Sequence, residues 1–209
     1  MESKNLSVTM MRFFDSGSAS AQNDGINIAN GSKEITMATP QFVLDLRKKI
    51  GHDLLWMMGV TGLVRDGQGR ILLGRRSDTG EWALVYGINE PGEQPADTVV
   101  REIKEETGVD AVVTDLVSVT SDPNPMTYVN GDIAQYMDHS FLCEVAPGGN
   151  AEPFVGDDES LNVGWFAMDD LPEPLAKSTV ERLALFRTFI ENKAKGDAHA
   201  LFRYDGTQR

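Results

Sequence analysis

The chain has 209 residues, of which 41% are hydrophobic and 24% are charged, and its formal net charge is −13. This composition is ordinary for a soluble globular protein and predicts one domain with appendages. The negative charge argues against sequence-independent binding to nucleic acid, which depends on Lys and Arg that neutralise phosphates. It allows a phosphorylated small-molecule substrate, because divalent cations can lie between the two negative partners.

Hydropathy and the few cysteine and histidine residues exclude further classes of protein. The longest uncharged apolar run, residues 54–64, is far shorter than a membrane span, and the start MESKNLSV lacks the pattern of a signal peptide. We therefore expect a cytoplasmic protein with no membrane partner. The single cysteine, Cys143, is expected to be buried in a strand. The histidines, His52, His139 and His199, are scattered and form no zinc-ligand pattern.

Three parts of the chain differ in composition and periodicity. Residues 1–38 are rich in Ser, Asn, Gly and Ala without a sustained period, which predicts a flexible N-terminal extension. Residues 39–196 carry the patterned segments and are predicted to form the domain, flanked by a helix at each end. Residues 197–209 are weakly patterned and are predicted to be a C-terminal tail.

The patterned part is predicted to begin with a helix. Thr39 is the expected N-cap, Pro40 the first helical residue and Gly51 the residue just beyond the end. This helix is expected either to pack on the domain or to form the interface of a homodimer.

Strands and helices alternate along the rest of the domain. They are, in chain order, strands at 54–66 and 70–76 joined by the turn sequence DGQG, a short strand at 81–87, a helix at 96–107 ended by Gly108, strands at 111–120 and 132–145, a strand at 162–168 and a helix at 177–195. In the last helix, the residues expected to face a core are Val180, Leu183, Leu185, Phe186 and Ile190. This order predicts a layered fold of the α+β or α/β/α type.

The helix at 96–107 carries acidic residues that local stability does not favour. Glu102 and Glu106 are like charges four residues apart, which costs about 0.2 to 0.5 kcal/mol. Glu105 and Glu106 lie in the final turn, where the helix dipole favours cations by about 0.3 to 1 kcal/mol. Arg101 offsets only part of this cost. Where local rules fail without local compensation, a functional site is the first suspect.

Three glutamates on one helical face suit a hard divalent cation. Mg²⁺ prefers carboxylate oxygens and takes its remaining contacts from water and substrate phosphate. An acidic run on a helix is more often only a solvated face, so the glutamates alone do not decide between the two interpretations. In the loop before the helix, Gly87 and Gly92 permit a tight turn or a close approach to a ligand. The side of the helix that can bury into a core consists of Ala96, Val99, Val100 and Ile103.

The longer pattern around these glutamates is far more specific than the acidic run. Gly87 is followed after five residues by Glu93, after seven more by Arg101-Glu102-Ile103, and then by Glu105-Glu106, Gly108 and Val109. It resembles the Nudix box at every defined position. The resemblance to Nudix hydrolases covers roughly residues 54–175 and implies an α/β fold, an α/β/α sandwich around a mixed β-sheet. It also implies Mg²⁺- or Mn²⁺-dependent hydrolysis of a nucleoside diphosphate linked to another group.

The resemblance also implies roles for individual residues. The implied metal ligands are Tyr86 through its backbone carbonyl, Glu93 in or near the metal shell, Glu102, Glu105 and Glu106. Arg101 would hold carboxylates in place. The implied general base is either Glu102, which we prefer, or an acid on a later loop, with the candidates Glu152, Asp157, Asp158 and Glu159. One departure bears on the shape of the loop and the substrate pocket: Val85-Tyr86 precede the box glycine, where many members have Pro-Gly.

The substrate is less well specified than the reaction. Trp82, Tyr128 and Trp165 are candidates to stack on a base, although each is more often a core or rim aromatic. Pro125 lies sixteen positions after Val109, which resembles a marker of ADP-ribose pyrophosphatases and is also ordinary turn chemistry. We expect ADP-ribose or a nucleotide sugar. The alternatives are hydrolysis of nucleoside triphosphates or dinucleoside polyphosphates, a sensor that binds a nucleotide metabolite without hydrolysing it, and an isomerase on the same scaffold.

Overall fold

The structure, a computed structural model, describes residues 39–204 and 207–208; the predicted N-terminal extension lies outside the described residues. The elements are α1 (Gln41–Ile50), β1 (Leu55–Arg65), β2 (Ile71–Arg76), β3 (Trp82–Ala83), β4 (Val85–Ile88), α2 (Pro95–Thr107), β5 (Ala111–Ser121), β6 (Met126–Thr127), β7 (Ile133–Val145), β8 (Ser160–Phe166), α3 (Lys177–Ala194), β9 (Arg203–Tyr204) and β10 (Thr207–Gln208). None of the described helices combines the length and the apolar character that a membrane span requires.

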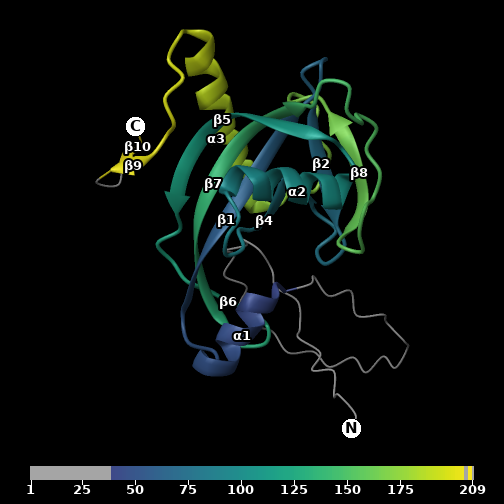
Figure 1. Cartoon of the computed structure of the whole chain (residues 1–209). Coiled ribbons are helices and arrows are strands. Elements are labelled where there is room, and N and C mark those ends of the chain that lie inside the picture. The colour runs from purple at the N-terminus through teal and green to yellow at the C-terminus, as the bar shows by residue number, and fades with distance from the viewer. Residues whose placement is uncertain (1–38, 205–206, 209) are drawn as a thin grey trace.

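A mixed sheet forms the centre of the fold, with β1 in its middle (Figure 1). β1 pairs in parallel with β7 and antiparallel with both β2 and β4. β5 extends the sheet beyond β7, while β3 and β8 both pair with β2. α2 and α3 lie on opposite faces of the sheet (Figure 1). The predicted α/β fold with a mixed sheet is therefore confirmed.

Side chains of β1 alternate between the two helices, as the period of a strand requires. Val60 and Val64 are buried in the cluster that contains α2, whereas Leu63 is buried in the cluster that contains α3. The cysteine predicted to be buried in a strand, Cys143 of β7, is fully buried on the α2 side. Both faces of the sheet are thus covered where the box helix is seated.

α1 closes one end of the sheet (Figure 1). Its fully buried Val43 belongs to a cluster that also contains Tyr86, Tyr128 and Tyr136. The predicted N-cap is wrong: the cap position is Pro40, and α1 begins one residue later without a side-chain cap. Gly51 ends the helix as predicted, with a φ of 60°. Its role as a homodimer interface stays a prediction.

Three further expectations differ from the structure. The strand predicted at 81–87 is split into β3 and β4, because Leu84 donates its backbone N–H to Thr179 Oγ1 instead of to a strand. On α3, Leu183 and Phe186 are buried as predicted, but Val180 is 52% exposed and Arg182 is buried in its place. In the weakly patterned tail, Leu201 is buried and its N–H donates to Val117 O at 2.7 Å, so it extends the edge of the sheet beside β5.

Candidate active site

The acidic helix α2 is seated closely on β1. Its buried Val99 and Ile103 lie directly over Gly62, where a Cβ atom would be 2.9 Å from Val99 Cγ2. At its C-terminal end Gly108 has a φ of 70°, in the left-handed region, and donates its N–H to Lys104 O. The apolar face fixes the helix, and the glutamates lie on its other side.

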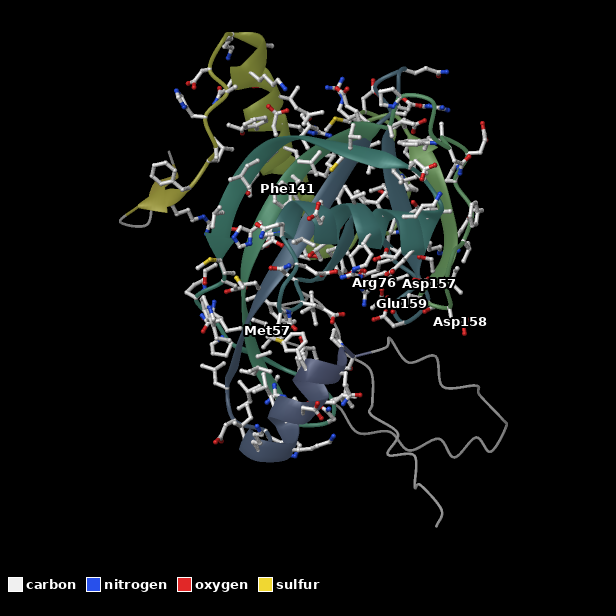
Figure 2. The ribbon with its side chains drawn as sticks, viewed as in Figure 1. Met57, Arg76, Phe141, Asp157, Asp158 and Glu159 are labelled. Carbon is white, nitrogen blue, oxygen red and sulfur yellow. The ribbon has the colours of Figure 1, made fainter. Side chains whose placement is uncertain are left out.

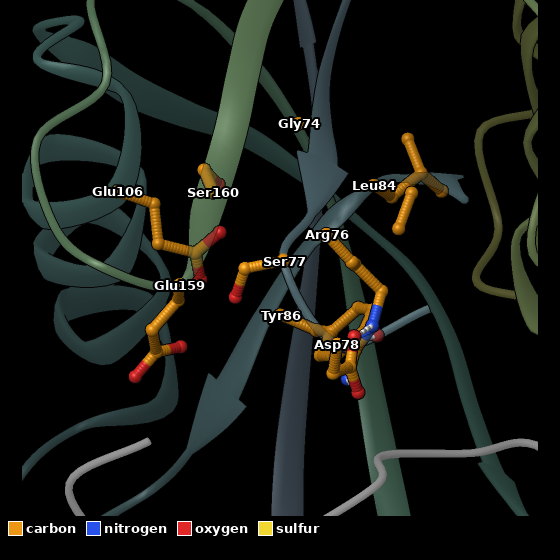
Figure 3. A pocket seen from close by; sticks show the side chains of 10 residues that line it. Gly74, Arg76, Ser77, Asp78, Leu84, Tyr86, Glu106, Glu159 and Ser160 are labelled. Atoms are coloured by element: carbon orange, nitrogen blue, oxygen red, sulfur yellow. Dashed lines mark hydrogen bonds and ion pairs between the residues drawn. The ribbon is translucent and has the colours of Figure 1, made fainter. Parts of the chain in front are cut away.

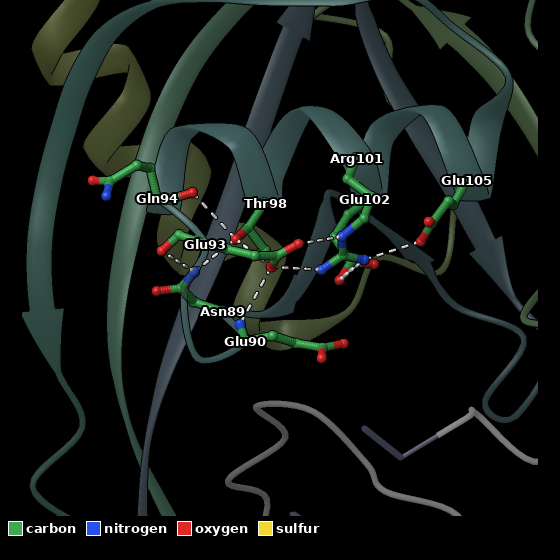
Figure 4. A network of polar contacts seen from close by, with 8 residues as sticks. All are labelled: Asn89, Glu90, Glu93, Gln94, Thr98, Arg101, Glu102 and Glu105. Atoms are coloured by element: carbon green, nitrogen blue, oxygen red, sulfur yellow. Dashed lines mark hydrogen bonds and ion pairs between the residues drawn. The ribbon is translucent and has the colours of Figure 1, made fainter. Parts of the chain in front are cut away.

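Arg101 connects three of the predicted site carboxylates (Figure 4). Its guanidinium donates to both oxygens of Glu93 at 2.9 and 3.1 Å, and its Nη1 donates to Glu102 Oε1 and Glu105 Oε2 at 3.0 Å each. Glu93 also accepts the hydroxyl of Thr98 at 2.9 Å. The hydrogen bonds from Arg101 lower the pKa of Glu93 to about 2. This geometry is the one expected of a residue that holds carboxylates in place.

Glu102 lies against the box glycine. A Cβ atom on Gly87 would be 2.1 Å from Glu102 Oε1 and 2.2 Å from its Cδ, so a side chain at position 87 would displace the carboxylate. Burial raises the pKa of Glu102 to about 7, against the attraction of Arg101. The absence of a side chain at Gly87 therefore leaves the space that the Glu102 carboxylate occupies beside β4.

Glu106 borders a pocket on the other side of the cluster (Figure 3). The pocket is also lined by four residues from other elements. They are Glu159, just before β8, Arg76 at the end of β2, Asp78 in the turn that follows, and Tyr86 of β4. Burial raises the pKa of Glu106 well above its usual range, and the charges of Glu102 and Glu159 raise it further. Three carboxylates and a guanidinium thus line one pocket.

The loop before β8 is bound to the C-terminal end of α2. Phe154 donates its N–H to Thr107 O at 2.9 Å, Gly156 donates to Glu106 O at 3.0 Å, and Asn150 Nδ2 donates to Gly108 O at 2.8 Å. A Cβ atom on Gly156 would be 1.9 Å from the carbonyl oxygen of Glu105, so only glycine fits this approach. Residues separated by about fifty positions in the sequence are thereby brought together.

The four later acids predicted as candidate bases differ in their surroundings, and Figure 2 labels the three that follow one another before β8, Asp157, Asp158 and Glu159. Glu159 lines the pocket beside Glu106, and the charge of Asp157 acts on Glu106. Glu152 and Asp158 are exposed.

Arg76, Asp78 and the side chain of Tyr86 are pocket residues that sequence analysis missed. Arg76 donates through Nε to Asp78 Oδ1 at 2.7 Å, through Nη2 to Asp78 Oδ2, and through Nη1 to the Tyr86 hydroxyl. A signal existed in the run Arg75-Arg76-Ser77-Asp78 at the end of a strand, where polar residues of opposite charge often begin a loop of a site.

Trp82 and Tyr128, predicted to contact substrate, lie in the core. Trp82 is 9% exposed and packs edge-to-face on Phe166, with the ring centroids 4.8 Å apart. Tyr128 is 4% exposed, and its hydroxyl is 2.7 Å from that of Tyr136. Neither ring is among the described residues that line the pocket of Glu106. This geometry lends no support to a stacking role for either residue.

A NUDIX domain model matches residues 56–186, which is more than half of the chain. The chain belongs to the NUDIX family. Members of this family are hydrolases that act on pyrophosphate bonds. A MutT-like protein of Streptomyces ambofaciens is 33% identical over 129 residues, which are 62% of this chain and 75% of that protein.

The chain covers very different shares of two further relatives. The 8-oxo-dGDP phosphatase NUDT18 of Mus musculus is 29% identical over 147 residues, which are 69% of this chain and 41% of that protein. The crystal structure of an ADP-ribose pyrophosphatase from Streptococcus suis matches with a TM-score of 0.51 and 26% identity, over 71% of this chain and 98% of that one. The chain therefore spans less than half of the mouse relative and almost all of the bacterial one.

The donor set suits the divalent metals that NUDIX hydrolases generally use. Glu102, Glu106 and Glu159 are hard oxygen donors whose mutual repulsion a cation would offset. Among the described residues, however, no three acidic, His or Cys side chains are already gathered to hold one ion. Arg101 engages an oxygen of both Glu102 and Glu105, so ligation requires these side chains to turn toward Glu106. The residues fit a metal after this rearrangement.

The metal-free protein is expected to lose stability as the pH rises from about 4.5 to about 7. Because the pKa of Glu102 in the folded chain is raised from 4.5 to about 7, the folded state binds more protons than the unfolded state in this interval, and the pKa of Glu106 is shifted in the same direction. Glu93, whose pKa is lowered from 4.5 to about 2, acts in the opposite direction, but its contribution is nearly complete once the pH exceeds the unfolded value of 4.5.

Urea unfolding in EDTA at pH 5.0 and pH 7.5 measures this effect. The decrease in the free energy of unfolding between the two pH values should be smaller in Glu102→Gln than in wild type. It should also be smaller in wild type when Mg²⁺ is added. An unfolding free energy that increases over the interval would contradict the expectation.

Proposed function

We propose that this protein hydrolyses the diphosphate bridge of a nucleoside diphosphate linked to another group, with Mg²⁺ or Mn²⁺ as its cofactor. The observation that carries this proposal is the pocket in which Glu106 and Glu159 face Arg76. Carboxylates can hold a cation and a guanidinium can bind phosphate, so the two walls suit the two parts of a metal–diphosphate complex. ADP-ribose or a nucleotide sugar is the proposed substrate, in line with the bacterial relative named an ADP-ribose pyrophosphatase.

Each site residue has a proposed role in this reaction. Glu102, Glu105 and Glu106 would hold the metal, together with the backbone carbonyl of Tyr86. Arg101 would orient Glu102 and Glu105, as its hydrogen bonds to both indicate. A bound divalent cation would supply charge neutralisation at the phosphates and a more acidic water. Glu93 would act through Arg101, because both of its carboxylate oxygens accept from that guanidinium.

The chemical step would be the attack of water on one phosphorus of the bridge. The oxygen of water bonds to that phosphorus, the bridging oxygen leaves with the other phosphate, and two phosphomonoesters result. Glu102 is the proposed proton acceptor; in this role its Oε2, which Arg101 does not bind, would take the proton, and Glu105 and Glu106 would hold the metal. Glu159 is the second candidate, since it lines the same pocket. Arg76 would bind the non-attacked phosphate.

A substrate panel tests the proposed function. Purified protein with Mg²⁺ or Mn²⁺ is incubated with ADP-ribose, nucleotide sugars, 8-oxo-dGDP, dinucleoside polyphosphates and nucleoside triphosphates, and the products are separated by chromatography. We expect metal-dependent formation of two phosphomonoesters from ADP-ribose or a nucleotide sugar, abolished by EDTA. Preferential cleavage of nucleoside triphosphates or dinucleoside polyphosphates would support those alternatives instead. Binding of one compound without turnover of any would identify a sensor.

A further inference from the structure

Tyr86 contacts the pocket with its side chain as well as with its backbone. Its side chain lies beneath Arg76, whose Cζ is 5.4 Å from the centre of the tyrosine ring. The Tyr86 hydroxyl forms a hydrogen bond with Arg76 Nη1. The ring is 5% exposed and packs with Met57 and Val43 in the cluster at the α1 end of the sheet. It is therefore rigidly held and engages Arg76 in two ways, through the ring face and through the hydroxyl.

Asp78 holds the same guanidinium from a second side. Its two oxygens accept from Nε and Nη2 of Arg76, and the Asp78 side chain is 3% exposed. Asp78 is itself fixed, because its Oδ1 accepts the N–H of Thr79 at 2.8 Å. The neighbouring Ser77 donates its N–H to Glu159 O at 2.8 Å, which ties this turn to the acidic wall of the pocket. Arg76 is thus set in place relative to the carboxylates opposite (Figure 3).

Arg76 retains donors for a ligand in this arrangement. Asp78 and Tyr86 take three of its five N–H groups, and Arg76 lines the pocket, so two N–H groups are left to bind a ligand there. A buried guanidinium is costly unless it is paired, and Asp78 alone would satisfy that need. The hydroxyl of Tyr86 adds a third fixed point that a phenylalanine of the same ring volume would lack. Its effect is on orientation rather than on packing.

We propose that Tyr86 is a positioning residue, which through its hydroxyl fixes the Arg76 guanidinium in the orientation that binds a diphosphate. The inference rests on the proposed function for the role of Arg76. An arginine held in its bound orientation loses less conformational entropy when the ligand arrives, so the ligand binds more tightly. The interaction exists before and during the reaction alike, so its loss raises KM and leaves kcat nearly unchanged.

The test uses Tyr86→Phe, which keeps the ring and removes the hydroxyl. Binding of methylenediphosphonate, a diphosphate that cannot be hydrolysed, is measured by calorimetry with Mg²⁺ present. We expect the Kd to rise about tenfold, the effect of one hydrogen bond to a charged group. KM for the best compound of the panel should rise by a similar factor, with kcat within about twofold of wild type. Tyr136→Phe is the matched control, because it also removes a buried tyrosine hydroxyl. Its Kd for the probe and its KM should match those of wild type.

A double-mutant cycle shows whether Tyr86 acts through Arg76. Arg76→Met should weaken binding of the probe more than Tyr86→Phe does, and adding Tyr86→Phe to Arg76→Met should change the Kd no further. An unchanged Kd in Tyr86→Phe, or an equal loss in the Arg76→Met background, would overturn the inference. Wild type that does not bind the probe would overturn it as well. If wild type binds the probe but cleaves no panel compound, the proposed function fails and the positioning role of Tyr86 is still decided by the cycle.

Discussion

Glu106→Gln is expected to abolish turnover and to leave the fold intact. The substitution keeps the size of the side chain and removes the charge that faces Glu159 and Arg76 in the pocket. Even residues that only orient metal ligands cost about 10- to 100-fold when they are lost, so kcat should fall more than about a hundredfold at saturating Mg²⁺. Steady-state kinetics on the best panel compound, with Mg²⁺ titrated from limiting to saturating concentration, measures the fall in kcat.

The same variant should be at least as stable as wild type when no metal is present. Burial and the charges of Glu102 and Glu159 disfavour an ionised Glu106, and the amide removes that cost. The difference in melting temperature between variant and wild type in EDTA should therefore be zero or positive at pH 7.5, and it should diminish when Mg²⁺ stabilises wild type. Glu191→Gln, an exposed glutamate of α3, is the control and should alter neither rate nor stability. Near-normal turnover by Glu106→Gln would refute the metal-ligand role.

The fold was predictable where local signals and tertiary packing agree. Gly108 ended α2 as predicted, and the DGQG turn joined β1 to β2. Errors arose where tertiary contacts override local patterns. Val180 lies in an apolar pattern, yet α3 turns Arg182 toward the sheet, where it meets the buried Asp138 at 3.4 Å. The apolar period of a helix does not indicate that the core beneath it contains a carboxylate such as Asp138.

The site was predictable to the extent that its residues are close in sequence. Glu93, Arg101 and Glu102 belong to one loop and helix, and the resemblance of this stretch to the Nudix box implied that Arg101 holds carboxylates there. The opposite wall comes from β2 and β4, whose contact depends on strand pairing. Arg76 and Tyr86 meet only because both strands pair with β1, and no local pattern encodes that meeting.

The aromatic predictions show a related limit. A tryptophan or tyrosine near a motif can lie in a pocket wall or in the core, and composition does not distinguish the two. Trp82 and Tyr128 are buried against Phe166 and Tyr136, whereas Tyr86, which was considered only for its carbonyl, has the ring that borders the pocket. For Trp82 of β3 and Tyr86 of β4, the direction of the side chain from a short strand makes the difference.

Gly87→Ala is expected to reduce kcat about a hundredfold, since a misplacement of about 1 Å can cost that much. The added Cβ would lie 2.1 Å from Glu102 Oε1, and the carboxylate, the flexible partner, would have to move away from β4. The chain should still fold, because β4 backbone geometry at this position needs no left-handed φ. Gly67→Ala is the control: nothing lies within 4 Å of its added Cβ, so its kinetics should match wild type. Wild-type turnover by Gly87→Ala, with its fold verified by circular dichroism, would mean that the position of Glu102 against the box glycine has no part in catalysis.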